Sequence, residues 1–232
     1  MDIAIVTGAS KGIGLAISRQ LITRNYKIYA LARDFTPCSF NHDNFIKKQC
    51  DITDTPRLIE TIKNIFNEKQ SLNLLINNAG IGIFGPLETI APKDIDKMVR
   101  TNLMAPIILT RLVLNRLKES NGRIINISST AALTAKPMGA VYSATKAGLL
   151  NFGESLFEEI RKQGVAITTI CPDMTSDTDF YRNSNFKPHK SFDTSIAPSV
   201  ISDAVINVLN QPAGTVISHI TIKPQRFQIE KK

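Results

Sequence analysis

Tyr142 and Lys146 stand four residues apart in the stretch Tyr142-Ser143-Ala144-Thr145-Lys146. Residues with this spacing share one face of a helix, so a helical stretch would place the phenol beside the ammonium. A free phenol has a pKa of about 10 and is a poor acid or base at neutral pH. A nearby ammonium favours the phenolate and would lower that pKa toward the range of general acid–base catalysis. By itself, so short a pattern is more typical of an aromatic residue and a lysine on a solvated helix.

A glycine-rich stretch near the N-terminus could hold phosphate groups. The run Asp2–Val6 predicts a buried strand, and Thr7-Gly8-Ala9-Ser10-Lys11-Gly12-Ile13-Gly14 leads from it into a helix that ends near Arg24. Gly8 would allow the tight turn, Gly12 the approach of a pyrophosphate, and Gly14 the packing of helix on strand. The helix N-terminus adds free N–H groups and a positive dipole. An ordinary turn is the alternative, but this position favours nucleotide binding.

The second strand, expected over 27–32, ends in Arg33-Asp34. An acidic residue here would bind the ribose 2′-hydroxyl of NAD, whereas a basic residue would accommodate the 2′-phosphate of NADP. We favour Arg33, because Lys11 in the glycine loop would add a second cation on the same side. The alternative is that both are ordinary surface cations.

Composition limits the protein class. The chain has 232 residues, of which 43% are hydrophobic and 21% charged, with a formal net charge of +8. We expect one soluble α/β domain over residues 1–232, in the cytoplasm, since no signal peptide or membrane-spanning run stands out. The three cysteines are far apart, which argues against disulfides and against a metal site. The basic residues are scattered, so we expect no nucleic acid partner.

Strands alternate with helices along the chain, which predicts a Rossmann-like, doubly wound parallel sheet of about seven strands. Strands are expected at 2–6, 27–32, 45–50, 72–76, 123–127, 165–170 and 216–222. Helices are expected at about 12–24, 54–69, 92–118 (interrupted near Pro106), 138–160 and 199–209. Residues 173–197 read as irregular. Ligands of such a sheet sit outside the carboxyl ends of its strands, where the unusual sequences fall.

These motifs together resemble the short-chain dehydrogenase/reductase family over nearly the whole chain. The glycine stretch is similar to its cofactor loop, Asp51-Ile52 to its adenine-contacting pair, and Asn77-Asn78-Ala79-Gly80 to its sheet-stabilising motif. Asn102, Ser129, Tyr142 and Lys146 match its catalytic tetrad. Ser129 is chosen over Ser128 because it precedes Tyr142 by 13 residues, which is the family's spacing.

The resemblance implies hydride transfer between a carbonyl compound or alcohol and NADP(H). Tyr142 would be the general acid or base, Ser129 would stabilise the carbonyl oxygen, and Lys146 would lower the Tyr142 pKa and hold the nicotinamide ribose. Asn102 would position a water behind Lys146, although by itself this residue is more typical of helix packing or of a hydrogen bond beside a kink. Residues 173–197 would form a lid over the substrate.

One segment departs from the family pattern. Pro172 is expected at the cofactor, but Asp173 follows it where the family commonly has Gly, and Asp177 stands where a Thr usually contacts the nicotinamide amide. Thr175 and Thr178 lie nearby, so the contacting residue stays open. Asp173 would also disfavour anionic substrates by repulsion.

The predicted function is that of an NADP-dependent carbonyl reductase or alcohol dehydrogenase. The closing Ile220–Gln225 stretch resembles that of members that act on small 3-hydroxy acids or on diverse carbonyls. A 3-oxoacyl reductase is the first alternative. A non-catalytic NADP-binding sensor or scaffold is the second. The helical regions 92–118 and 138–163 resemble those of family oligomers, which predicts a homodimer or homotetramer.

Overall fold

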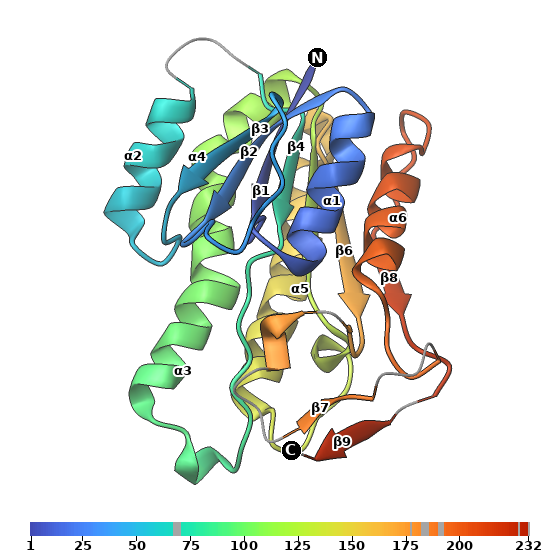
Figure 1. Cartoon of the computed structure of the whole chain (residues 1–232). Helices are drawn as coiled ribbons and strands as arrows, with labels where there is room; N and C mark the ends of the chain where they lie inside the picture. Colours follow the sequence, from blue (N-terminus) through green and yellow to red (C-terminus); the bar gives the residue numbers. More distant parts are fainter. Residues whose placement is uncertain (67–70, 177, 182–185, 190–192, 227, 232) are drawn as a thin grey trace.

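A seven-stranded parallel sheet forms the centre of the computed structural model, with helices on both faces (Figure 1). The structure describes residues 1–66, 71–176, 178–181, 186–189, 193–226 and 228–231. The strand order is β3-β2-β1-β4-β5-β6-β8, so the chain builds outward from β1 in one direction and then restarts at β4 in the other. The expected single-domain, doubly wound sheet is confirmed, and β1 and β4 flank its switch point.

The elements lie close to their expected positions. The sheet strands are β1 Asp2–Thr7, β2 Tyr26–Ala32, β3 Phe45–Gln49, β4 Leu74–Asn77, β5 Arg123–Ile127, β6 Ala166–Pro172 and β8 His219–Ile222. The α-helices are α1 Gly12–Thr23, α2 Thr55–Ile65, α3 Pro92–Val99, α4 Ala105–Glu119, α5 Ala140–Ile160 and α6 Pro198–Leu209. The expected end of the second helix near residue 69 lies outside the described residues.

Two hydrophobic layers cover the sheet. Side chains of neighbouring strand residues point to opposite faces, so Ile5 packs on one face while Ala4 and Val6 pack on the other. Buried residues of α2 and α4 belong to the first layer, and those of α1 and α6 to the second. Because both faces are covered, β1 and β4 consist of apolar runs rather than alternating patterns.

The expected interruption of the 92–118 helical region is a π-helical turn over Arg100–Met104, between α3 and α4. Pro106 has no N–H to donate to the carbonyl four residues before it, which is that of Asn102. The Asn102 carbonyl therefore lacks its usual α-helical donor. The side chain of Asn102 is fully buried there.

The described residues of the region 173–197 form more regular structure than expected. It contains a short 3₁₀ turn, η5 (Asp179–Tyr181), and a strand, β7 (Phe186–Pro188), which pairs antiparallel with β9 (Ile229–Lys231) near the C-terminus. The sequence predicts an irregular segment here and a basic tail. Strands of three residues are too short to show a period in the sequence, and only their pairing reveals them.

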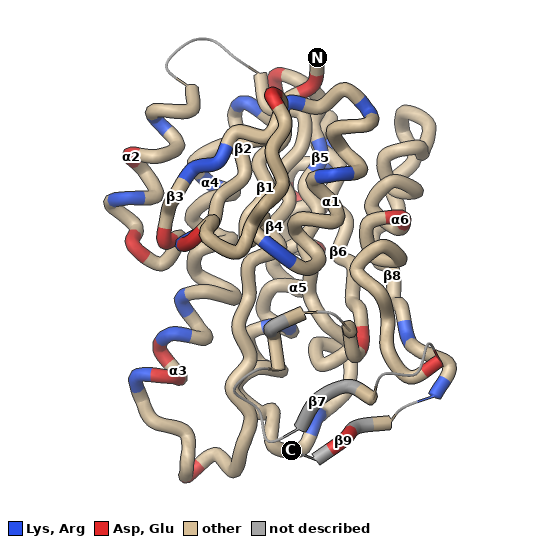
Figure 2. The backbone as a smooth tube through the Cα atoms, viewed as in Figure 1, with Lys and Arg blue, Asp and Glu red and all other residues tan. Residues whose placement is uncertain are grey.

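Charged residues are distributed over the surface (Figure 2). Lys and Arg positions occur on several helices and loops, interspersed with Asp and Glu, as the sequence indicated. In the described part of the chain, no helix has both the length and the apolar character needed to cross a membrane.

Candidate active site

A cleft with a volume of about 730 Å³ opens at the carboxyl ends of the strands. It brings together residues that are far apart in the sequence, as a switch point of a parallel sheet predicts. Of the residues expected at the site, all but Gly14 and Asn102 line it, namely Gly8, Ser10, Lys11, Gly12, Ile13, Arg33, Asp51, Ile52, Asn78, Ala79, Gly80, Ser129, Tyr142, Lys146 and Pro172.

The glycine loop has the close contacts that the sequence predicted. Gly8 and Gly12 have φ values of 65° and 55°, which side chains rarely adopt. A Cβ on Gly8 would lie 2.9 Å from the Cα of Ala79, and one on Gly14 would collide with the carbonyl oxygen of Gly8. Lys11 stands at the N-cap of α1, and its ammonium carries no acceptor atom that could cap the N–H groups of the helix N-terminus. This cradle fits the phosphates of a dinucleotide.

Hydrogen bonds from the segment after β4 hold the start of the glycine loop in place. The side chain of Asn78 donates to the carbonyl of Thr7 over 2.9 Å, while the backbone N–H groups of Asn78 and Ala79 both donate to the Thr7 hydroxyl over 3.0 Å. Asn77 donates across to the Asn126 side chain over 2.9 Å and so links β4 to β5. These bonds match the sheet-stabilising role that the resemblance implied.

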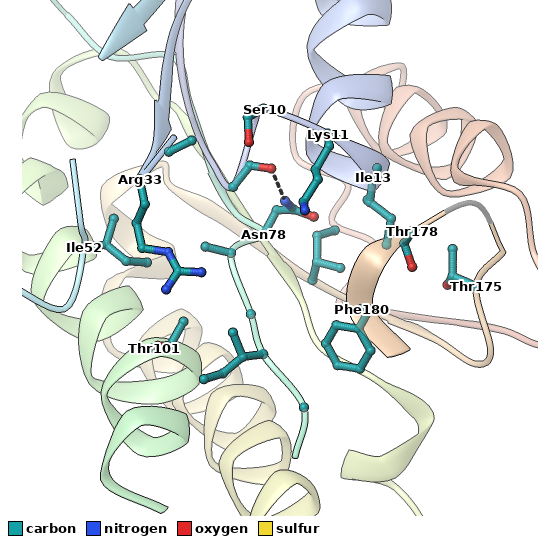
Figure 3. A pocket seen from close by; sticks show the side chains of 18 of the residues that line it. Ser10, Lys11, Ile13, Arg33, Ile52, Asn78, Thr101, Thr175, Thr178 and Phe180 are labelled. Atoms are coloured by element: carbon teal, nitrogen blue, oxygen red, sulfur yellow. Dashed lines mark hydrogen bonds between the residues drawn. The ribbon is translucent and has the colours of Figure 1, made fainter. Parts of the chain in front are cut away.

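Arg33 points its guanidinium into one end of the cleft (Figure 3). The neighbouring Asp34 is tied elsewhere, because its carboxylate accepts bonds of 2.7 and 2.6 Å from the backbone and hydroxyl of Thr36. These bonds lower the pKa of Asp34, and the charge of Lys11 contributes to the same shift. This end of the cleft therefore presents the cations Arg33 and Lys11 to a bound group.

Ser129 and Tyr142 face one another at the other end of the cleft. Burial raises the pKa of the Tyr142 phenol to about 12, and a hydrogen bond with the Ser129 side chain partly opposes that rise. Ser128 cannot take this place, because its hydroxyl is buried and donates to the Lys146 carbonyl over 2.9 Å. The choice of Ser129 made on spacing thus has a physical reason.

Lys146 lies in the wall behind Tyr142, and its effect differs from the expected one. Its ammonium donates to the Ile127 carbonyl over 2.9 Å and lies 5.9 Å from the centre of the Tyr142 ring. Burial lowers the pKa of Lys146 itself to about 8. The expected lowering of the Tyr142 pKa by Lys146 is not found in this structure: burial of the phenol raises that pKa, and the opposing effect comes from the Ser129 hydrogen bond.

The side chain of Asn102, just outside the cleft, forms hydrogen bonds to two separate segments. Its side-chain oxygen accepts the Ile81 N–H over 2.8 Å, and its amide donates to the Ile81 carbonyl over 2.8 Å and to the Thr145 hydroxyl over 3.1 Å. The π-helical turn that carries Asn102 turns the side chain inward. Asn102 therefore connects the segment after β4 to α5, one turn from Tyr142.

Sequence reasoning left the contacts of the 173–197 segment open, and the structure places Thr178 against the glycine loop. Its methyl carbon would lie 3.2 Å from a Cβ on Gly12. The Thr178 hydroxyl is buried and has no hydrogen-bond partner among the described residues. Asp177, at the family's usual Thr position, lies outside the described residues. Thr178 is thus a cofactor-contact candidate, whereas Thr175 already donates to the Asp173 carbonyl.

Sequence reasoning missed an aromatic cluster around the phenol. Phe84 lies 5.3 Å and Phe180 5.6 Å from Tyr142, measured between ring centres, and Tyr181 packs 5.0 Å from Phe180. Phe84 comes from the loop after β4, while Phe180 and Tyr181 come from η5. No periodic pattern joins residues of two separate loops, so the sequence held no signal for this contact.

Comparison with known protein sequences gives a family for these features. The profile described as short chain dehydrogenase matches residues 2–188. The NADP-dependent 3-hydroxy acid dehydrogenase YdfG of Salmonella typhi is 30% identical over 96% of this chain and 94% of its own length.

Solved structures resemble the fold over nearly its full length. A metagenomic short-chain oxidoreductase in complex with NADP has a TM-score of 0.81 and 29% identity, covering 96% of this chain and 97% of its own. A 4-hydroxyisoleucine dehydrogenase complexed with NADH has a TM-score of 0.83 and 27% identity, covering 97% of each chain. The relatives thus include proteins with either nicotinamide cofactor.

Proposed function

The chain belongs to the short chain dehydrogenase family, and on that premise we propose that it interconverts a carbonyl compound and a secondary alcohol with NADP(H). The observation that carries this proposal is the meeting of Tyr142, Ser129 and Lys146 at one end of a cleft whose other end is a glycine cradle. A bound nicotinamide would supply or accept the hydride. The protein supplies the remaining parts, which are binding, orientation and a proton.

Tyr142 is suited to be the acid of the reductive direction. With its pKa raised to about 12, the phenol is fully protonated at neutral pH. As the carbonyl carbon is reduced, the electrons of the C=O π bond move to oxygen, and that oxygen takes the proton of Tyr142. The Ser129 hydroxyl, next to the phenol, donates a hydrogen bond to the same oxygen and stabilises its growing charge. The oxidative direction needs the phenolate, so it requires a higher pH or an added positive charge.

Lys146 and Asn102 complete the site from behind. Lys146, with a pKa near 8, exchanges protons readily near neutral pH and restores the proton of Tyr142. Its ammonium would also hold the nicotinamide ribose of a bound cofactor. Because Pro106 gives no N–H to the Asn102 carbonyl, that carbonyl is available to a water between Lys146 and solvent. The side chain of Asn102 does not hold the water, since Ile81 and Thr145 occupy it.

NADP(H) is the preferred cofactor in this proposal. Arg33 and Lys11 favour the additional 2′-phosphate, and the acidic alternative, Asp34, is held by Thr36. YdfG, the relative described as NADP-dependent, supports the same assignment. Asp51 and Ile52 would contact the adenine, and the Thr178 hydroxyl would bond the pyrophosphate or the carboxamide.

Residues 173–197 act as the lid of the site in this proposal. Thr178, Phe180 and Tyr181 from this segment all line the cleft. The pairing of β7 with β9, and an ion pair of 3.4 Å between Asp193 and Arg226, attach the segment to the C-terminal tail. Met174 and Ile196 are buried and hydrogen-bonded to one another, so they anchor the two ends of the segment, and η5 lies between these anchors at the cleft.

The central test is Tyr142→Phe, which keeps the ring and removes the proton donor. We expect NADPH binding, measured by its fluorescence, to change less than about threefold, since the phenol is a small part of the cofactor contact. Turnover with a carbonyl substrate should fall by about 10²- to 10⁴-fold. Tyr29→Phe changes a buried tyrosine in the first hydrophobic layer and serves as the control. Wild-type turnover in Tyr142→Phe would exclude the mechanism.

A further inference from the structure

The wall of aromatic side chains around Tyr142 has no role in the reaction proposed above. Phe84 packs on Tyr142 at a ring-centre distance of 5.3 Å and on Tyr181 at 6.3 Å, the latter with planes only 24° apart. Phe180 contacts the same Tyr142 ring at 5.6 Å in an edge-on arrangement. With Ile81 and Ile83 also packed against the cluster, the surface next to the phenol is apolar.

Gly82 makes this packing possible. A Cβ on Gly82 would lie 2.6 Å from a ring carbon of Phe84 and 2.7 Å from the Cζ of Phe180, closer than side-chain atoms approach. Both rings therefore sit against the backbone of the segment that follows β4. Phe180 is thereby packed edge-on against the Tyr142 ring, in the part of the cleft that Tyr142 and Ser129 line.

The charges near this wall oppose an anionic substrate. Asp173 lines the cleft and raises the pKa of both Tyr142 and Tyr181, adding to the larger effect of burial. Of the described cations of the cleft, Lys146 lies beside the rings, 5.9 Å from the centre of the Tyr142 ring, but its ammonium is directed to the Ile127 carbonyl. Lys11 and Arg33 lie at the cradle and at the end of β2, Lys97 is an exposed residue of α3, and Lys146 is buried against Ile127.

We propose that Phe84, Phe180 and Tyr181 select uncharged carbonyl compounds with an aromatic group next to the carbonyl. The proposal rests on the function proposed above and names its substrate class. A substrate that displaces Phe180 breaks ring contacts with Tyr142 and Phe84, and an aromatic substituent restores contacts of the same kind. An aliphatic substituent restores less, and a carboxylate is placed in an apolar wall beside Asp173. The class thus differs from the 3-hydroxy acids named for YdfG.

Two pairs of matched compounds test the proposal. Acetophenone and cyclohexyl methyl ketone have similar size but differ in aromaticity, and methyl acetoacetate and acetoacetate differ in charge. We expect kcat/KM with NADPH to be at least about fivefold higher for acetophenone than for the cyclohexyl ketone. We expect kcat/KM to be at least about tenfold higher for methyl acetoacetate than for acetoacetate. Acetoacetate reduced as well as its ester would overturn the proposal.

Single substitutions test which side chains cause the preferences for acetophenone and for the ester. Phe180→Leu and Phe84→Leu keep an apolar side chain, and each should remove most of the preference for acetophenone while leaving NADPH binding unchanged. Asp173→Asn should reduce the preference for the ester by about threefold or more. Phe66→Leu, which changes a buried ring outside the cleft, controls for lost stability and should leave both preferences intact. An acetophenone preference that survives in both leucine variants would refute the role of the rings.

A binding measurement separates failure of this proposal from failure of the proposed function. Saturation-transfer NMR of the four compounds with the wild-type protein and NADP⁺ needs no turnover. Selective binding of acetophenone and of the ester without any reduction would contradict the proposed reaction but support the substrate class. Equal saturation transfer to the members of each pair would overturn the substrate class, whatever the turnover.

Discussion

Lys146→Met should stabilise the cofactor-free protein while it removes activity. The side chain of Lys146 is only 3% exposed, and burial lowers its pKa from 10.5 to about 8. The unfolded chain therefore holds a proton that the folded protein releases between these two pH values. Because the unfolded state binds more protons there, stability must rise with pH across this window.

The shift in the Lys146 pKa gives the size of this difference in stability. One pKa unit corresponds to about 1.36 kcal/mol, so the buried ammonium destabilises the folded state by about 3 kcal/mol at pH 7 and about 1.4 kcal/mol at pH 9.5. Methionine fills similar space without a charge, but it loses the bond to the Ile127 carbonyl, which costs about 1–1.5 kcal/mol. The net gain should be about 2 kcal/mol at pH 7 and close to zero at pH 9.5.

Urea unfolding of both proteins without cofactor, at pH 7 and pH 9.5, measures this difference. The high pKa of Tyr142 is common to both proteins and cancels from the comparison. Lys93→Met, which removes an exposed positive charge from α3, is the control and should show no such pH dependence. A Lys146→Met protein that is less stable than wild type at pH 7, or a difference that is the same at both pH values, would refute this account.

Four further predictions concern the cofactor, the lid and assembly. Arg33→Ala should raise the Kd for NADPH about 10- to 100-fold, since a charge-assisted contact is lost, and should leave that for NADH nearly unchanged; equal Kd values for the two cofactors in the wild type would contradict this. Thr178→Val should raise the NADPH Kd about fivefold by removing one hydrogen bond while leaving the melting temperature of the cofactor-free protein unchanged, and an unchanged Kd would exclude Thr178 as a contact. Deletion of residues 226–232, which include β9, should raise the KM for the carbonyl substrate more than it lowers the affinity for NADPH. An unaltered KM would show that the C-terminal tail does not hold the lid in place. Light scattering at micromolar concentration should give the mass of a two-fold symmetric homo-oligomer. Val99, Leu133 and Met138 expose apolar surface on and beside the helical regions 92–118 and 138–163, which such an assembly would cover. The mass of a monomer would contradict this prediction.

The sequence by itself determined the sheet and most of the cleft. Apolar strands and amphipathic helices have periods that can be read locally, and parallel strands must bring their carboxyl ends to one edge. The glycine loop, Arg33 and the segment from Asn77 to Gly80 were therefore predictable as neighbours. The four-residue spacing placed Tyr142 and Lys146 on one helical face, and both line the cleft.

Only the tertiary structure decided the electrostatics and the substrate end. Whether burial or a neighbouring charge controls the Tyr142 pKa depends on how deeply the phenol lies, and depth is a property of the packed chain. The contacts of Phe180 with Phe84, and of Thr178 with Gly12, join loops that lie far apart along the chain. The β7–β9 pair is likewise non-local and too short to leave a pattern. Local periodicity carries no information about contacts of this kind, because they form only after the sheet has brought its loops together.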